Sequence, residues 1–247
     1  MAQHKGIVPL IGTIGGINFY MRNGKIFARN AGGGFTTNAL KKGKNMVRVR
    51  ENGSEFGHCS RVKKVFKDCL FPFFGMQKDQ DLHARMMQLF LKIKDCDITS
   101  ERGKRHVSVG LRQTEGQKLL TGFAFTPFHL DVLQGVYDAA TFTYTVSNFN
   151  HKQLLYPNGA THFEICLGVM VFDFGEMKAT LFSSAVVLIA KGTALESFNL
   201  SPTDEPVSNG MRIPILGYRY VQELNGEVYT LKDKETYGVR VLEVISS

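Results

Sequence analysis

The segment INFYMRNGKIFARN, residues 17–30, predicts the first structural element of this 247-residue chain. Asn23-Gly24 stands at its centre, and this dipeptide favours a type I′ turn because both residues accept a positive φ. Pairing outward from the turn places Tyr20 opposite Phe27 on one face of a β-hairpin. The other face receives four apolar side chains: Phe19, Met21, Ile26 and Ala28.

The predicted hairpin has apolar or aromatic side chains on both faces. A two-stranded hairpin alone is at best marginal in water, so this one must dock either on its own domain or on a neighbouring copy. The run Gly32-Gly33-Gly34 follows it and is typical of a flexible joint, which is the geometry that exchange of an arm between subunits requires. We therefore expect an assembly arm over residues 1–35, with these contact residues: Phe19, Tyr20, Met21, Ile26 and Phe27.

Residues 36–104 predict a basic linker, up to residue 53, followed by a helical hairpin. The first helix begins at Ser54 and ends before Pro72, with an apolar stripe through Phe56, Cys59 and Val62. The second helix is indicated by the spacing of five apolar residues: Leu82, Met86, Leu89, Phe90 and Ile93. The segment from Lys41 to Lys67 carries nine positive charges and is a candidate contact for nucleic acid or an acidic partner: Lys41, Lys42, Lys44, Arg48, Arg50, Arg61, Lys63, Lys64 and Lys67.

From about residue 105 to the end, the pattern predicts strands. Val107, Val109 and Leu111 alternate with polar residues, and longer apolar runs follow at 163–172 and 178–190. A second Asn-Gly, at 225 and 226, predicts a hairpin whose buried face carries Tyr218, Tyr220, Tyr229 and Leu231. The fold class is therefore α+β: a β-hairpin arm, a helical hairpin and an antiparallel β-sandwich over residues 105–247.

Charge is distributed unevenly along the chain. The formal net charge is +8; residues 1–70 carry +10, residues 71–125 carry +3 and residues 126–247 carry −5. A basic front and an acidic rear favour either a nucleic-acid partner or contact between the two ends of neighbouring copies, while ordinary solvated charge is the alternative without a partner.

The sequence contains no motif that predicts catalysis, a cofactor or a metal. Its four cysteines form no C-x-x-C pair, Gly43-Lys44 lacks the rest of a P-loop, and His162-Phe163-Glu164 lacks the second half of a zinc deaminase motif. Alternation puts His162 and Glu164 on one face of a strand, which we expect to be the solvent face. We predict no enzymatic activity and no cofactor.

The N-terminus shows no signal-peptide pattern, because Pro9 and several glycines interrupt its apolar run. No segment approaches the roughly 20 apolar residues of a membrane span. We expect synthesis in the cytoplasm, with reduced thiols.

Several segments resemble a large group of uncharacterised Bacteroidota proteins. They are Gly12 to Tyr20 with Asn23-Gly24-Lys25, Arg48 to Asn52 with Glu55-Phe56-Gly57, Gly159 to Phe163, and Gly217 to Gly226. That group has no established enzymatic role, so the resemblance implies a bacterial or phage-derived, non-enzymatic protein and assigns no catalytic residue.

These features together favour a structural protein that assembles with itself, head to tail, into a filament, tube or phage-like particle. Two alternatives remain open at this stage. One is a nucleic-acid-associated protein that uses the Lys41 to Lys67 segment, and the other is a ligand- or carbohydrate-binding β-sandwich.

Overall fold

The structure, a computed structural model, divides the chain into two compact units, residues 1–52 and 53–247. The division falls within helix α2 (Val47–Cys69). The structure describes residues 2–3, 10–32, 37–74, 81–126, 133–206, 209–231, 233 and 235–246.

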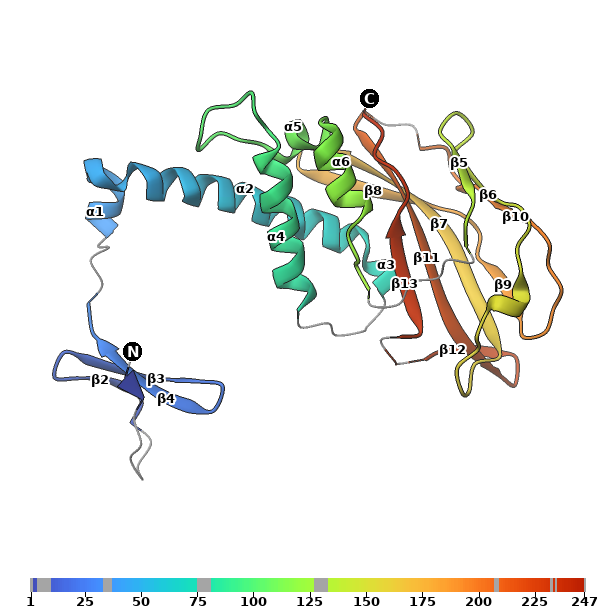
Figure 1. Ribbon diagram of the computed structural model, residues 1–247, viewed down its shortest axis with the longest axis horizontal. Helices are drawn as coiled ribbons and strands as arrows, with labels where there is room; N and C mark the ends of the chain where they lie inside the picture. The colour runs from blue at the N-terminus through green and yellow to red at the C-terminus, as the bar shows by residue number, and fades with distance from the viewer. Residues whose placement is uncertain are drawn as a thin grey trace. The chain divides into compact units, whose positions relative to one another are not determined.

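The first unit contains an antiparallel sheet in the order β1-β4-β3-β2 (Figure 1). Its strands are β1 (Ala2–Gln3), β2 (Gly12–Ile14), β3 (Ile17–Arg22) and β4 (Lys25–Asn30). The predicted hairpin is confirmed: β3 pairs with β4 so that Tyr20 faces Phe27, and Asn23 and Gly24 both have positive φ, as a type I′ turn requires. We call these four strands the arm sheet. Most of the predicted glycine joint lies outside the described residues.

The prediction of a linker over residues 36–53 is wrong, because this segment is largely helical. It holds α1 (Thr37–Lys42), the 3-10 turn η1 (Lys44–Met46) and the first turns of α2. Helix α2 therefore begins seven residues before the predicted cap at Ser54. Its first residues are largely polar and basic, and this composition alone had favoured a loop. The guanidinium of Arg50 donates to the carbonyl oxygens of Leu40 and Gly43, at 2.8 and 3.0 Å, and so ties α2 to the end of α1.

The second unit opens with helices that cover one face of a large sheet. After α2 come α3 (Phe71–Phe74), α4 (Leu82–Asp95), α5 (Val107–Leu111) and α6 (Thr114–Thr121). All five apolar residues predicted for the second helix are buried in α4. In α2 the buried stripe passes through Glu55 and not through Phe56, which is exposed.

The strand predicted over residues 107–111 is helix α5. Val107 and Leu111, four residues apart, are both buried, and a short apolar alternation satisfies either periodicity. Gly110 decides the packing: a Cβ there would lie 1.9 Å from the carbonyl oxygen of Ile93, so only glycine lets α5 approach the backbone of α4.

Two long central strands build the main sheet of the second unit. They are β7 (His162–Asp173) and β11 (Met211–Leu224), antiparallel to each other. Shorter strands flank them: β8 (Lys178–Ser183) and β9 (Val187–Ala190) on β7, and β12 (Glu227–Thr230) and β13 (Tyr237–Val241) on β11.

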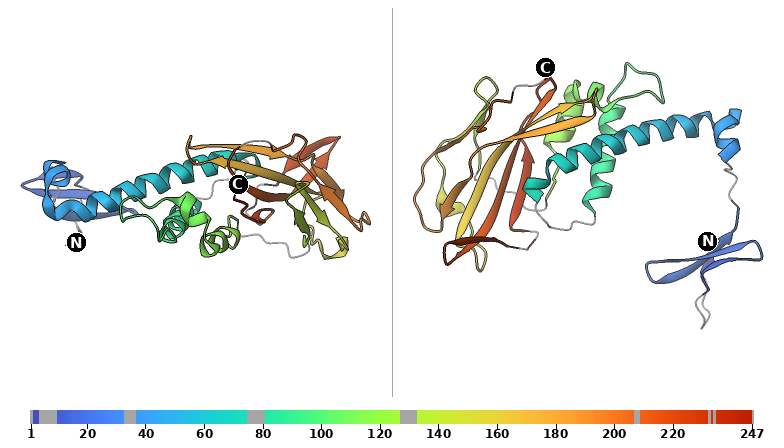
Figure 2. Two further views of the ribbon diagram at one scale, coloured as in Figure 1. Left: turned by 90° about the horizontal axis from the view of Figure 1, so that it is seen from above. Right: turned by 180° about the vertical axis from the view of Figure 1, so that it is seen from behind.

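A three-stranded sheet, in the order β10-β6-β5, covers the other face of the main sheet. Its strands are β5 (Val136–Asp138), β6 (Thr143–Val146) and β10 (Phe198–Leu200), and the turn η2 (His151–Gln153) follows β6. The second unit therefore has three layers: helices, main sheet and small sheet (Figures 1 and 2). Two apolar cores lie between these layers, and the α+β class with an antiparallel sheet pair is confirmed.

The sides of β7 and β11 alternate between the two cores. Phe163, Ile165 and Leu167 pack with Tyr218 and Tyr220 toward the small sheet. On the opposite side, toward the helices, Phe73 of α3 lies over Gly168 and Gly217. A Cβ on Gly217 would be 2.0 Å from the Phe73 ring, so the sheet accepts this ring only because glycine stands there.

The hairpin predicted at Asn225-Gly226 is confirmed as β11 and β12. Tyr218 and Tyr220 on its predicted inner face are buried, but Tyr229 is exposed. All four residues of β12 are exposed, whereas Leu231, which follows it, is half-buried against the core that contains Tyr218 and Tyr220.

Candidate assembly interface

In the part of the first unit that the structure describes, the side chains form no buried core. None of the described side chains in residues 10–52 is buried, and among the residues whose burial is described the first buried one is Glu55. Three aliphatic side chains of the arm sheet are strongly exposed: Ile14 at 57%, Ile17 at 40% and Met21 at 52%. A sheet with no buried side chain gains too little from packing to offset the loss of chain entropy on ordering.

The strand register sorts the side chains of the arm sheet onto two chemically different faces. Directly paired residues share a face, and successive residues of a strand alternate between faces. One face, which we call the apolar arm face, carries Ile14, Ile17, Phe19, Met21, Ile26 and Ala28, with Asn30 at its edge. The other, the basic arm face, carries Thr13, Asn18, Tyr20, Arg22, Lys25, Phe27 and Arg29. The five predicted arm contacts are thus divided between the two faces.

An aromatic pair stands at the centre of the basic arm face. The rings of Tyr20 and Phe27 have centroids 6.0 Å apart and planes inclined by 28°. The guanidinium of Arg29 lies 5.5 Å from the centroid of the Tyr20 ring, within reach of a cation–π interaction. The Asn18 amide donates to the Thr13 hydroxyl at 3.2 Å.

The nine cations of the Lys41 to Lys67 segment do not form one equivalent set. Six are exposed without an ion pair in the described part of the chain: Lys41, Lys42, Lys44, Arg61, Lys64 and Lys67. Arg48 pairs with Glu51 at 2.9 Å, and Arg50 caps carbonyl groups at the end of α1. Lys63 is only 5% exposed, with its amine 2.9 Å from a ring nitrogen of His83. Burial lowers the pKa of Lys63, and Lys67 adds to this effect.

A buried ionic cluster, which the sequence analysis did not find, joins α2 to the segment after α4. Glu55 is 2% exposed and accepts four hydrogen bonds: from Lys94 at 2.6 Å, the Gly103 amide at 2.7 Å, and two nitrogens of Arg105 at 2.8 Å each. Asp95 also contacts Lys94 and Arg105, at 2.6 and 2.7 Å. The hydrogen bonds from Arg105 lower the pKa of Glu55 to about 2, with Lys94 and Gly103 adding to them, and outweigh the opposing effect of burial.

A second buried carboxylate, that of Asp97, binds backbone amides of the segment after α4. Asp97 accepts hydrogen bonds from the backbone amides of Thr99, Ser100 and His106, at 3.1, 3.0 and 3.0 Å. Burial acts to raise the pKa of Asp97, but these donors outweigh it and hold the pKa well below its usual value. A carboxylate held by several donors to one loop serves to fix that loop.

His58 completes the cluster beside the start of α5. Its Nε2 accepts a hydrogen bond from the Val107 amide at 3.1 Å, and its ring packs edge-on against that of His106, with centroids 4.5 Å apart. Burial lowers the pKa of His58 to about 4, and the nearby His106 and Arg61 contribute in the same direction. Both carboxylates and His58 have partners within the fold, and these contacts hold the segment after α4 against α2.

His162 and Glu164 share one face of β7, as predicted. The same face of β7, toward its other end, packs against the helices. Glu164 pairs with Arg219 at 2.7 Å, and His162 lies 3.2 Å from Glu223. Both residues are half-buried and not, as predicted, on an open solvent face.

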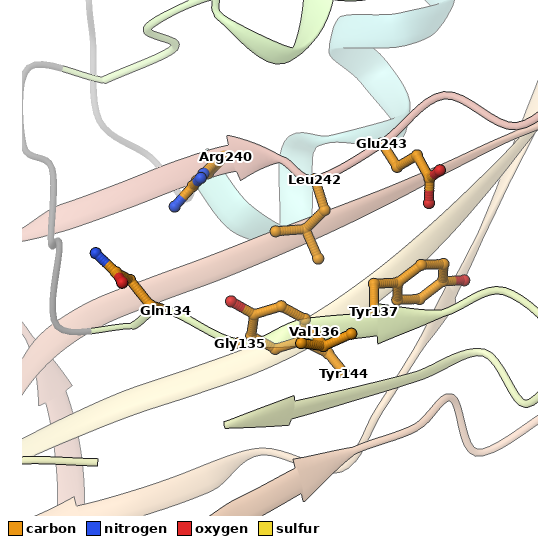
Figure 3. A pocket seen from close by; sticks show the side chains of 8 residues that line it. All are labelled: Gln134, Gly135, Val136, Tyr137, Tyr144, Arg240, Leu242 and Glu243. Carbon is orange, nitrogen blue, oxygen red and sulfur yellow. The ribbon is translucent and has the colours of Figure 1, made fainter. Parts of the chain in front are cut away.

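A cleft of about 550 Å³ lies where the edges of the two sheets separate (Figure 3). Tyr137 and Val136 of β5 line one side, and Arg240, Leu242 and Glu243, from β13 and the residues after it, line the other. The Tyr137 hydroxyl is buried and has no hydrogen-bond partner among the described residues. Burial raises the pKa of Tyr137 to about 12, and the negative charge of Glu243 adds to this. This cleft is the candidate site for a ligand of the β-sandwich, the second alternative from the sequence.

Within the described ranges, no group of three or more His, Cys, Asp or Glu side chains is arranged to hold a metal ion. The helices that the structure describes include none long and apolar enough to cross a membrane. No family model, curated protein or solved structure matches this chain.

Proposed function

We propose that this chain is a non-enzymatic structural protein that assembles with further copies of itself through the apolar arm face. One observation carries the proposal: the arm sheet buries none of its described side chains, although six apolar residues share one of its faces. Contiguous exposed apolar surface of this kind marks an interface.

The free energy available from covering this face is substantial. Full burial of an Ile or Met side chain contributes about 1.5–3 kcal/mol, so covering the exposed halves of Ile14, Ile17 and Met21 contributes roughly 2–5 kcal/mol in total. Covering this face therefore offsets part of the chain entropy that the arm sheet loses when it becomes ordered.

Charge favours a second copy as the partner. Residues 1–70 carry +10 and residues 126–247 carry −5, so the front of one copy attracts the rear of the next. A contact between different surfaces of neighbouring copies repeats without closing and generates a filament or tube.

Light scattering over a range of protein concentrations, with negative-stain electron microscopy of the same samples, tests the proposal. We expect species much larger than the 27.6 kDa monomer, and we expect a monomer after deletion of residues 1–34. Substituting Ile14 and Met21 by Thr should also shift the population toward monomer, because Thr keeps strand propensity and removes apolar area.

The matched control is Asn18→Thr on the basic arm face, which should leave the size distribution unchanged. A 27.6 kDa particle at every concentration would contradict the proposal and would indicate that the arm docks on its own second unit. Large species that persist after deletion of residues 1–34 would exclude the arm as the interface.

A further inference from the structure

The basic arm face combines cations with an aromatic pair, and attraction between the charged ends of neighbouring copies does not explain the aromatic pair. Two aromatic rings stand at its centre, and three cations surround them: Arg22, Lys25 and Arg29. Neutral polar residues, Thr13 and Asn18, also lie on this face, and none of its described side chains is acidic.

Charge around this face is not neutralised within the first unit's strands and short helix. The first 50 residues contain nine Lys or Arg and no Asp or Glu; Glu51 is the first acidic residue of the chain. Soluble protein surfaces ordinarily mix both signs of charge, so nine cations without an acid favour a polyanionic partner.

The aromatic pair distinguishes between polyanions. An acidic protein or a polyphosphate would use the cations and gain little from two rings. Single-stranded nucleic acid uses both, because its bases stack on aromatic side chains while Lys and Arg contact its phosphates. A sheet face with aromatic residues on adjacent strands is a recurring platform for this mode, in which two or three bases stack on the rings.

A sheet face suits an unpaired strand better than a duplex. Sequence recognition in duplex DNA requires an element that enters the major groove, and bases within a duplex offer no face for stacking. Tyr20 and Phe27 project from the middle of a sheet and not from a helix or loop that could enter a groove.

We propose that the basic arm face binds single-stranded nucleic acid, with two bases stacked on Tyr20 and Phe27 and phosphates bound by Arg22, Lys25 and Arg29. The strand pleat directs these side chains away from the apolar arm face, so nucleic acid and a second copy would contact different faces of the arm sheet. It also differs from the binding mode expected from sequence, in which the Lys41 to Lys67 segment makes the contacts.

Fluorescence anisotropy of the full-length protein with a labelled oligothymidine of about 20 nucleotides tests this inference, and the matching RNA and a duplex serve as comparisons. We expect Tyr20→Leu and Phe27→Leu each to weaken binding of the single strand by roughly 5- to 150-fold. Replacing Arg22 and Lys25 by Gln should reduce the steepness of the plot of log K against the logarithm of the salt concentration by about 1.4. Each phosphate contact to a single strand contributes about 0.7 to this slope.

Lys41→Gln with Lys42→Gln on α1 is the matched control for charge, since it removes the same two positive charges outside the face. This variant should weaken binding less than the variant with Arg22 and Lys25 replaced by Gln. If the α1 variant abolishes binding and the ring variants do not alter it, the site lies in the basic segment and the inference is wrong. Equal affinity for inorganic polyphosphate and the oligonucleotide would also overturn it, since stacking would then contribute nothing.

Photocrosslinking of the unmodified protein to a bromouracil-substituted strand keeps the test independent of whether the ring variants fold. We expect the crosslinked peptide to contain Tyr20 or Phe27. Crosslinks confined to other segments, or no binding to any single strand at low salt, would refute the inference. Neither result bears on the size of the protein's assemblies, so it would leave the proposed function standing.

Discussion

Replacing Glu55 by Gln should destabilise the second unit more than any other single charge removal in the buried cluster. Gln keeps the shape of the side chain but leaves Lys94 and Arg105 without the carboxylate that accepts three of their hydrogen bonds. Breaking a buried ion pair by removing one partner costs about 3–5 kcal/mol. Asp95 still contacts both cations at 2.6 and 2.7 Å, so we expect the lower end, about 3 kcal/mol.

The pKa of Glu55 gives the same magnitude and sets its pH dependence. That pKa falls from 4.5 in the unfolded chain to about 2 in the fold, and a shift of this size corresponds to about 3 kcal/mol. Because the folded pKa is depressed, the stabilisation is complete above pH 4.5 and is lost as the pH falls toward 2. The difference in stability between wild type and Glu55→Gln should therefore shrink across this interval.

Urea denaturation followed by far-ultraviolet circular dichroism, at pH 7 and at pH 3, measures both effects. Glu101→Gln is the matched control: it removes the same charge from a carboxylate whose partner, Lys104, is also at the surface, and it should leave the midpoint unchanged. A Glu55→Gln protein with the wild-type midpoint at pH 7 would refute the reasoning. So would a difference that stays constant from pH 7 to pH 3, because the cost would then come from packing and not from the ionised carboxylate.

Two further predictions concern the packing of the second unit. Gly217→Ala should lower the urea midpoint strongly, because the new Cβ would overlap the ring of Phe73. Gly57→Ala on α2 is the control: its Cβ meets nothing within 4 Å, so it should raise stability by up to about 1 kcal/mol. Equal midpoints for the two variants would contradict the contact between Gly217 and Phe73. The pKa of His58 is about 4 in the fold against 6.5 in the unfolded chain, so His58 contributes stability above pH 6.5 that is lost as the pH falls toward 4. His58→Gln should flatten the dependence of stability on pH in that interval, measured by denaturation of wild type and variant. An unchanged pH dependence would show that the hydrogen bond from Val107 does not depend on the neutral ring.

Local patterns predicted the elements that local chemistry determines. Both Asn-Gly turns and their registers follow from residues adjacent in sequence, and the α4 stripe follows from helical spacing. The segment 107–111 was predicted wrongly because five residues satisfy two periodicities, and the choice between them depends on Gly110 meeting the backbone of α4, more than ten residues away.

The buried cluster could not be predicted for a related reason. Glu55 adjoins Phe56, and hydrophobicity alone places Phe56 in the core. Glu55 is buried instead because Lys94 and Arg105, about 40 and 50 residues further on, supply donors that only the tertiary fold brings together. The sequence held a weak signal in the adjacent charges of Lys94 and Asp95 within an otherwise amphipathic helix, but nothing in it specified their partner.

When the arm sheet becomes ordered, both of its faces form at the same time. The entropy lost when strands β2 to β4 become ordered is the same whichever face is covered first. A partner on the apolar arm face therefore lowers the cost of binding at the basic arm face, and the reverse holds equally, because coupling between two ligands of one protein is reciprocal. Neither partner needs to touch the other for this coupling to arise. A chain built in this way would assemble more readily on nucleic acid than in its absence, and would bind nucleic acid more tightly once assembled, with the arm sheet as the element through which each event acts on the other.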